Sequence, residues 1–270
     1  MLGFQSDPML RALVATSLLM ITGVLSQAPG PPGAPFAARA FARDGKIMPY
    51  RLFVPDEAAR RQPLPLVVWL HGASGMGTDN LRQITEGGND LGSRLWVRPD
   101  IQAKYPSFVV APQMPTTQIW GFPASEKLTP YAQLVVDLID SLAKEFPIDR
   151  HRIYVLGQSM GGIGVWDLIS KRPDVFAAAV PVCATANANR VAAAAGVKVW
   201  VFHGAKDTGM PVASAREAVA AFQAAGGAIK YTEYADAGHD VWTRAFAEPE
   251  LPAWLFAQRR TTPDCDRLCR

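Results

Sequence analysis

A serine lies at the centre of the most informative motif in this sequence. Ser159 is the middle residue of Gly157–Gly161, which has the pattern G-x-S-x-G. In that pattern a strand turns sharply into a helix, so that the serine hydroxyl is exposed beside a helix N-terminus, which favours negative charge. The apolar stretch Ile153–Leu156 leads into the motif, and a helical pattern from Gly161 to Ser170 leads out of it. The motif predicts Ser159 as a nucleophile; the alternative is a tight turn in a non-catalytic α/β protein.

A serine hydroxyl needs a general base, and histidine suits that task near neutral pH. Of the four histidines, His151 lies in a polar turn, where we expect it to be exposed, and His71 and His203 each precede a glycine at a strand end, where we expect them to shape turns. His239 follows a strand and precedes the last helix. In strand-to-helix turns of this kind the acid and then the histidine follow the serine along the chain. We therefore predict His239 as the base.

The acid should follow the strand before the last one. The apolar run Val199–Phe202 is followed by a short turn and then by Asp207. An aspartate there would accept the Nδ1 proton of the histidine and hold the useful tautomer. Asp236 and Asp240 are too close to His239 in sequence to reach around it. Asp167 falls on the helix after the serine motif, where we expect a surface residue.

Acyl transfer also needs hydrogen-bond donors that face the developing oxyanion. The backbone N–H of Met160, directly after the nucleophile, is the first candidate. The loop His71–Gly77 follows an apolar strand and is rich in glycine, as expected of the second donor loop. The N–H of Ala73 is our first choice for the second donor and that of Gly72 the next. A phosphate-binding loop is the alternative, but the Walker lysine is absent.

The rest of the sequence consists of short apolar runs that alternate with helical patterns. Runs of this kind are typical of strands buried on both faces of a parallel sheet. The alternation predicts a single doubly wound α/β domain, with a mostly parallel sheet, helices on both faces and an antiparallel N-terminal edge. The predicted strands are Ala37–Arg43, Tyr50–Val54, Leu66–Leu70, Phe108–Ala111, Ile153–Leu156, Ala177–Val182, Lys198–Phe202 and Ile229–Glu233; the predicted helices are Pro130–Phe146, the segment from Ser159 to Lys171, Val212–Ala225 and Glu250–Gln258.

The N-terminus has the plan of a secretory signal peptide. Arg11 precedes an apolar core, Ala12–Leu25, and Ser26-Gln27-Ala28 offers small residues for cleavage. The core is shorter than the roughly 20 residues that span a bilayer. We predict a signal peptide over 1–28, a Pro-rich linker over 29–36, the catalytic domain over 37–260 and a tail over 261–270. An uncleaved anchor is the alternative; with cleavage, the chain is secreted or periplasmic and has no stable membrane anchor.

Composition and cysteines exclude other classes of function. The net charge is only +3 and Lys and Arg form no blocks, so nothing indicates nucleic-acid binding. Export would allow Cys265 and Cys269 to form a disulfide, whereas their spacing and neighbours offer no metal site. Cys183 follows an apolar run and is predicted to be a buried, inert thiol.

Together these features resemble the α/β-hydrolase superfamily. More narrowly, the chain is similar to secreted bacterial esterases of the polyhydroxybutyrate depolymerase, feruloyl esterase and phospholipase/carboxylesterase-like group, some of them labelled predicted peptidases. The resemblance implies ester hydrolysis through an acyl-enzyme, without metal or organic cofactor. Relatives often carry charged residues where this chain has Ser74–Met76. The matching segments are Tyr50–Pro55, Leu70–Gly72, Gly77–Asn80, Val110–Gln113, Gly157–Gly162, His203–Asp207 and Gly238–Trp242.

The substrate is less constrained than the chemistry. Trp120, Phe122 and Trp242 are candidate walls of a pocket for an apolar or aromatic group or a polymer chain; ordinary core packing is the alternative for each. The expected partner is a small-molecule or polymer ester, and the sequence does not determine the oligomeric state. A serine peptidase would use the same three residues. A binding module without catalysis would have no physical reason to retain all of them.

Overall fold

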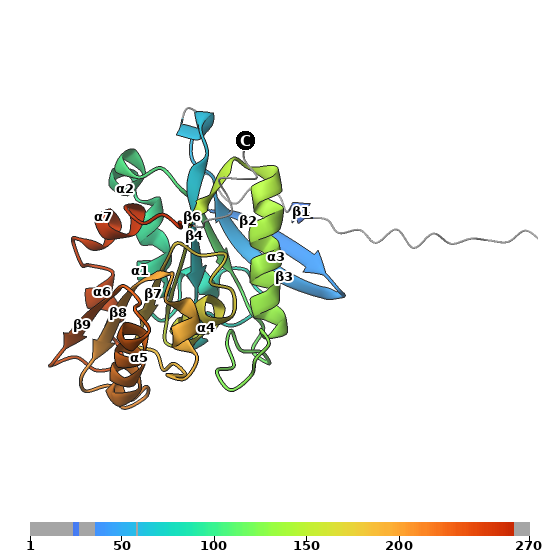
Figure 1. Cartoon of the computed structure of the whole chain (residues 1–270). Coiled ribbons are helices and arrows are strands. Elements are labelled where there is room, and N and C mark those ends of the chain that lie inside the picture. The colour runs from blue at the N-terminus through green and yellow to red at the C-terminus, as the bar shows by residue number, and fades with distance from the viewer. Residues whose placement is uncertain (1–23, 27–35, 58, 262–270) are drawn as a thin grey trace, which may run out of the picture.

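The structure is a computed structural model, and it describes residues 24–26, 36–57 and 59–261. Its centre is a nine-stranded sheet with the order β1-β2-β3-β5-β4-β6-β7-β8-β9, which crosses the whole molecule (Figure 1). The predicted leader, linker and tail, with Cys265 and Cys269, lie largely outside the described residues. Within the predicted leader, Val24–Ser26 forms β1 and pairs with β2.

The sheet is parallel from β5 to β9 and antiparallel at its N-terminal edge, as the sequence predicted. The edge arises because β2 and β3 are joined by the tight turn Asp44–Gly45, whose two residues both have positive φ. Parallel strands need longer crossovers, which the helices supply. The strands are β1 (Val24–Ser26), β2 (Ala37–Arg43), β3 (Lys46–Phe53), β4 (Leu64–Leu70), β5 (Phe108–Pro112), β6 (Ile148–Gln158), β7 (Ala178–Val182), β8 (Lys198–Gly204) and β9 (Ile229–Tyr234).

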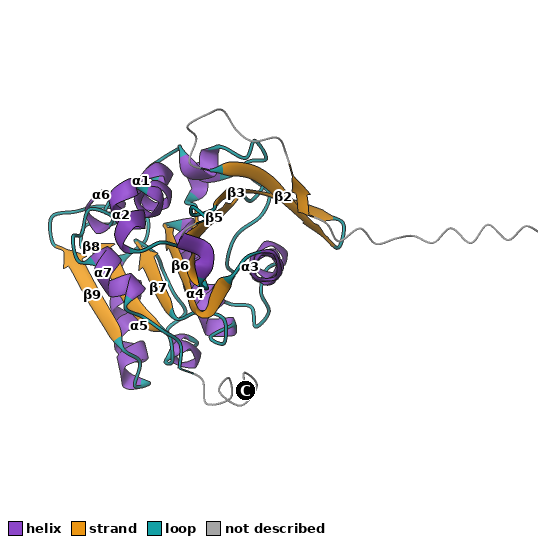
Figure 2. Ribbon diagram, turned by 90° about the horizontal axis from the view of Figure 1, so that it is seen from above, coloured by secondary structure: helices purple, strands orange, loops and turns teal. Residues whose placement is uncertain are grey.

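Helices cover both faces of the sheet (Figure 2). On the fully buried β4, Leu66 and Val68 face the core that includes α3, α4 and α5, whereas Val67 and Trp69 face the core that includes α2, α6 and α7. This alternation follows from the two-residue period of a strand. The helices are α1 (Asn89–Arg94), α2 (Pro99–Lys104), α3 (Pro130–Glu145), α4 (Met160–Lys171), α5 (Val212–Ala224), α6 (Trp242–Ala245) and α7 (Leu251–Phe256).

The longer helices begin and end where local chemistry predicts. Thr129 caps α3 by accepting the N–H of Ala132, and Pro130 occupies the first turn. The sequence did not predict α1, α2 or α6, because elements of four to six residues have too few turns for a periodic pattern. In the described part of the chain, no helix is both long enough and apolar enough to cross a membrane.

Candidate active site

Ser159 occupies the turn between β6 and α4 in a strained backbone conformation. Its φ of 54° and ψ of −120° lie outside the helical and extended regions. The turn is held on both sides: the N–H of Ser159 donates to Val182 of β7 at 2.9 Å, and its carbonyl accepts the N–H of Ile163 at 3.0 Å. Strain of this kind persists only where surrounding contacts over-determine it. The serine side chain therefore has a defined place at the carboxyl edge of the sheet.

The motif glycine after Ser159 is required by close backbone approach. A Cβ on Gly161 would collide with the backbone carbonyl of Leu70, the last residue of β4, and with that of His71. The turn between β6 and α4, called the elbow from here on, can therefore touch the loop after β4 only because this position has no side chain. This contact brings the two predicted oxyanion loops beside each other.

The structure brings Ser159, His239 and Asp207 into one hydrogen-bonded chain. His239 Nε2 lies 2.8 Å from Ser159 Oγ, and His239 Nδ1 lies 2.7 Å from Asp207 Oδ2. A carboxylate only accepts, so Nδ1 carries the proton in the neutral ring and Nε2 is free to accept the serine hydroxyl proton. The His239 side chain is 34% exposed and that of Asp207 is fully buried. The hydroxyl is thus paired with a base that is itself oriented by a buried acid.

Bonds between neighbouring loops set the distance between the acid and the base. The loop after β8 donates the Ala205 and Lys206 N–H groups to Tyr234 and Ala237, which lie at and after the end of β9, at 3.0 and 2.9 Å. Backbone hydrogen bonds therefore join the loop that carries Asp207 to the loop that carries His239.

The carboxylate of Asp207 is also held on its far side. Its Oδ1 accepts the N–H groups of Gly209 and Met210 at 2.9 and 2.8 Å, while its Oδ2 faces His239 Nδ1 at 2.7 Å and lies 3.5 Å from His203 Nε2. The competing acid Asp236 is exposed and forms a bidentate pair with Arg244. Its position excludes it as the partner of His239.

Asp167 is not the surface residue that the sequence predicted. It is 5% exposed, and its carboxylate pairs with Lys171 at 2.6 Å. Burial raises its pKa. The helix period would place Asp167 toward solvent, but the segment Gly121–Leu128 crosses over α4, and Lys171 also donates to the carbonyls of Phe122 and Lys127.

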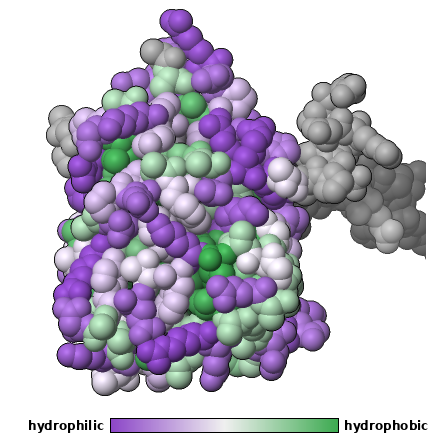
Figure 3. Space-filling model, turned by 60° about the vertical axis from the view of Figure 1, so that its left-hand side comes forward, coloured by the Kyte–Doolittle hydropathy of each residue, from purple (hydrophilic) through white to green (hydrophobic). Residues whose placement is uncertain are grey.

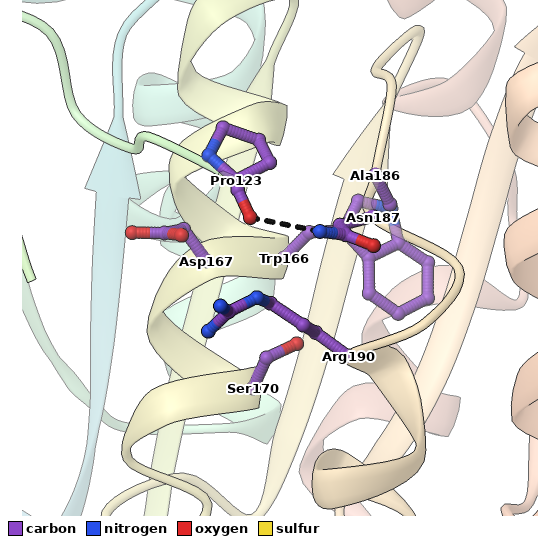
Figure 4. Close-up of a pocket in the computed structure, with 7 residues that line it drawn as sticks. All are labelled: Pro123, Trp166, Asp167, Ser170, Ala186, Asn187 and Arg190. Atoms are coloured by element: carbon purple, nitrogen blue, oxygen red, sulfur yellow. Dashed lines mark hydrogen bonds between the residues drawn. The ribbon is translucent and has the colours of Figure 1, made fainter. Parts of the chain in front are cut away.

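A small cavity of about 10 Å³ lies beside Asp167 (Figure 4). Pro123 and Asn187 close it with a hydrogen bond from Asn187 Nδ2 to the Pro123 carbonyl, at 2.9 Å. Asp167 Oδ2 and Trp166 Nε1 have no hydrogen-bond partner within the described residues. The volume suits about one water molecule, too little for an organic substrate.

The structure separates the two candidates for the second oxyanion donor. The N–H of Gly72 already donates to Asn89 Oδ1 at 2.8 Å. No acceptor for the N–H of Ala73 exists within the described ranges. Met160 is the first residue of α4, and the first N–H groups of a helix have no partner within it. The available pair is therefore Met160 and Ala73.

His71 and His203 both stabilise turns, as expected. His71 is fully buried, and desolvation lowers its pKa to about 4. Its Nδ1 donates to the Gly72 carbonyl at 2.7 Å, and its Nε2 accepts the N–H of Met114 at 3.2 Å, so the neutral tautomer is defined. His203 is likewise buried and donates from Nε2 to the carbonyl of Met210 at 2.8 Å.

The prediction for the burial of Cys183 is confirmed, whereas the prediction that His151 is exposed holds only in part. Cys183 is buried, and desolvation raises the pKa of its thiol, as an inert thiol requires. His151 is only partly exposed, because its Nδ1 donates to the carbonyl of Arg260 at 3.1 Å.

The three aromatic candidates occupy different environments. Trp120 is not a pocket wall: it is completely buried, and its indole N–H donates to the carbonyl of His71 at 3.1 Å. Phe122 is 52% exposed. Trp242 is half-buried and packs edge-on against the imidazole of His239. Sequence position alone could not distinguish these cases, because all three lie in irregular segments or short helices.

Sequence reasoning missed Asn89. This fully buried residue begins α1 and accepts the N–H of Gly72, in the loop after β4, from 17 positions away. Its only local signal was an asparagine after two glycines, which is also typical of an ordinary turn. Gln158, the motif residue before the serine, was not assigned a role either; its Nε2 donates to the carbonyl of Gly87 at 2.8 Å.

Comparison with known proteins agrees with this architecture. Residues 49–253 match the model of the dienelactone hydrolase family. A solved thermostable esterase has a TM-score of 0.79 and 35% sequence identity; the match covers 84% of this chain but only 64% of that esterase. No curated protein gives a significant match.

More distant solved structures share the fold alone. A ferulic acid esterase has a TM-score of 0.60 and 17% identity, over 82% of this chain and 98% of that one. An acylaminoacyl peptidase from Pyrococcus horikoshii has a TM-score of 0.60 and 13% identity, over 88% of this chain and 44% of that one. The family match spans most of the described domain, from β3 to α7. The chain therefore belongs to the dienelactone hydrolase family, within the α/β-hydrolase superfamily.

Proposed function

We propose that this chain is a serine hydrolase that cleaves carboxylic esters through an acyl-enzyme intermediate. The observation that carries the proposal is the continuous hydrogen-bonded chain Ser159–His239–Asp207, with distances of 2.8 and 2.7 Å. Such an arrangement lets the histidine accept the serine proton as the hydroxyl attacks a carbonyl carbon. No other hydroxyl of the described residues has both a histidine and a carboxylate aligned behind it.

In the first half of the reaction, Ser159 Oγ bonds to the carbonyl carbon and its proton passes to His239 Nε2. The carbonyl oxygen becomes an oxyanion, which the N–H groups of Met160 and Ala73 would stabilise. Collapse of this intermediate breaks the ester bond, and the imidazolium returns its proton to the leaving alcohol. Asp207 remains a carboxylate and stabilises the imidazolium.

In the second half, water replaces the alcohol. His239 accepts a proton from the attacking water, the same two N–H groups hold the second oxyanion, and the carboxylic acid leaves while Ser159 regains its proton. The products are one acid and one alcohol, and no other reactant is consumed.

A groove beside α6 is our candidate for holding part of the substrate. It lies between α1 and α6 and has a volume of about 330 Å³, and Thr243, the residue after Trp242, is among those that line it. Leu91 and Phe246 give it an apolar lining, and Arg94 stands among its charged residues. The face of the molecule in Figure 3 is of mixed hydropathy, with hydrophobic areas between hydrophilic ones. An ester with an apolar portion fits such a surface.

Two measurements test the proposal. A fluorophosphonate probe should label the folded wild-type protein at Ser159 and should not label Ser159→Ala. A panel of p-nitrophenyl esters, feruloyl esters and polyester substrates, run beside peptide amides, should give turnover of esters. Turnover of amides without turnover of esters would support a peptidase on the same machinery. Failure of the folded protein to react with the probe would contradict a serine hydrolase altogether.

A further inference from the structure

The turn Glu86–Asn89 touches three separate parts of the candidate active site. Asn89 binds Gly72 in the loop after β4. The carbonyl of Gly87 accepts the side chain of Gln158, the neighbour of the nucleophile, at 2.8 Å. Gly88, with a φ of +79°, lies against the indole of Trp242, and a Cβ there would collide with Trp242 Nε1. One short turn therefore connects the oxyanion loop, the elbow and the aromatic neighbour of His239.

The amide of Asn89 is fully engaged and has one possible orientation. Its Oδ1 accepts the N–H of Gly72 at 2.8 Å, and its Nδ2 donates to the carbonyl of Glu86 at 2.6 Å and to Ser74 Oγ at 3.2 Å. The N–H of Gly72 can only donate and the carbonyl of Glu86 can only accept, so the oxygen and nitrogen of the amide cannot be exchanged. The side chain is completely buried, so water cannot replace these bonds.

Gly72 is thereby held at both of its backbone polar groups. Asn89 holds its N–H, while its carbonyl accepts His71 Nδ1 at 2.7 Å and the N–H of Gly75 at 2.9 Å. A trans peptide bond is planar, with the carbonyl and the following N–H on opposite sides. Holding the Gly72 carbonyl therefore directs the Ala73 N–H the other way, and that N–H has no acceptor of its own within the described ranges.

We propose that Asn89 is a positioning residue of the oxyanion hole: it occupies the N–H of Gly72 and fixes the place of that residue before substrate binds. The Ala73 N–H, whose direction follows from the bonds of the Gly72 carbonyl to His71 and Gly75, is thereby left as the second donor. The inference rests on the proposed serine hydrolase. Asn89 touches neither substrate nor reacting atoms. Its effect reaches the reaction through the Ala73 N–H, which meets full negative charge only in the transition state and the tetrahedral intermediate.

The test uses Asn89→Leu, which keeps the size of the side chain and removes its hydrogen bonds. Active sites are titrated with the fluorophosphonate, and kcat, KM and the Kd of a boronic acid are then measured per active site. We expect kcat to fall about 10- to 100-fold with KM changed less than about threefold, because the misplaced donor acts on the transition state. The Kd of the boronic acid, whose tetrahedral adduct places an oxygen in the hole, should rise by the same factor as kcat/KM falls.

Two further variants separate positioning from general stability. Gln83→Leu removes another fully buried amide, which bonds Asn80 and not the oxyanion loop. It should lower stability without changing kcat or boronic acid affinity per active site. Asn89→Asp keeps an acceptor for Gly72 and should retain more activity than the leucine variant. If Asn89→Leu does not fold, Asn89→Ser carries the same expected losses.

The outcomes of this test are distinct. Suppose that kcat per active site and the affinity for the boronic acid are equal in Asn89→Leu, Gln83→Leu and wild type. This result would overturn the positioning role but would not contradict the proposed serine hydrolase. A wild-type protein that neither labels nor hydrolyses esters would overturn the proposed function itself. If wild type labels but does not turn over the esters, the rate of phosphonylation replaces kcat, since the phosphonyl oxygen occupies the same hole; an unchanged rate in Asn89→Leu again overturns the inference.

Discussion

The indole of Trp242 stands perpendicular to the imidazole of His239, with ring centroids 5.5 Å apart and an interplanar angle of 88°. Edge-to-face geometry of this kind is favourable and directional. Asp207 fixes the imidazole at Nδ1, but one hydrogen bond still allows the ring to tilt about it. The perpendicular indole supplies a second restraint on the orientation of the imidazole.

We therefore predict that Trp242→Ala lowers kcat by about tenfold, since small displacements of a catalytic group are expensive in rate. Trp242→Phe, which retains an aromatic edge, should keep most of the activity. Steady-state kinetics on a p-nitrophenyl ester measure both variants. The matched control is Trp254→Ala, because Trp254 packs edge-on against another tryptophan, Trp200, with ring centroids 5.3 Å apart. Equal losses in Trp242→Ala and Trp254→Ala would contradict a specific role.

Removing the nucleophile should separate activity from stability. Ser159→Ala should reduce turnover by more than ~10³-fold, with little change in the free energy of unfolding. Ser159→Gly should be equally inactive but more stable than the alanine variant by about 1 kcal/mol, because glycine adopts the strained φ of 54° without steric penalty. Urea denaturation measures the difference. A glycine variant less stable than the alanine variant would show that the turn stores no strain.

Asp207→Asn should retain the fold and slow catalysis by as much as ~10⁴-fold, because an amide NH₂ facing Nδ1 favours the wrong tautomer. The control is Asp236→Asn. Asp236 lies much nearer to His239 in sequence, but it pairs with Arg244 at the surface. Its loss should leave kcat unchanged. Full activity of Asp207→Asn would mean that another residue orients His239.

The buried neutral His71 predicts loss of stability in mild acid. Its pKa is about 4 in the native state, against about 6.5 in the unfolded chain. Between these values the unfolded state binds the extra proton, so stability falls as pH decreases from 6.5 toward 4. This residue alone should cost about 2 kcal/mol between pH 7 and pH 5.

His71→Gln, which cannot titrate, isolates that contribution. The variant should lose about 2 kcal/mol less than wild type over the same interval, measured by denaturant unfolding at both pH values. If the free energy of unfolding falls by the same amount in wild type and in the variant, His71 is protonated at no cost in the native state.

Because Asp167 and Lys171 form a buried ion pair, we predict that removing one charge destabilises the protein much more than removing both. Lys171→Met leaves the Asp167 carboxylate buried, with its Oδ2 already lacking a partner in the described part of the chain. It should destabilise the protein by about 3 kcal/mol. The double variant Asp167→Leu with Lys171→Met removes both charges and should recover most of that loss. Thermal unfolding of wild type and the two variants measures this difference. A double variant no more stable than Lys171→Met would contradict the coupling.

The sequence by itself determined the fold class and the candidate triad. Apolar strands and helix periodicity depend on neighbouring residues, so they are visible along the chain. Glycines around Ser159 identify a turn because only they permit that backbone path. Once the strands are parallel, their carboxyl ends meet at one edge, which places Asp207 and His239 near the serine without knowledge of side-chain contacts.

Only the tertiary structure decided which backbone donors are free and which aromatic side chains are buried. Asn89 engages Gly72 across 17 positions, and Trp120 reaches the carbonyl of His71 across 49. Such bonds depend on how distant segments pack, and an asparagine or a tryptophan has the same local pattern whether it is exposed or enclosed. The convergence of Ser159, His239 and Asp207 was therefore predictable from local sequence, whereas the finding that the N–H of Gly72 is already engaged required the contacts of the folded chain.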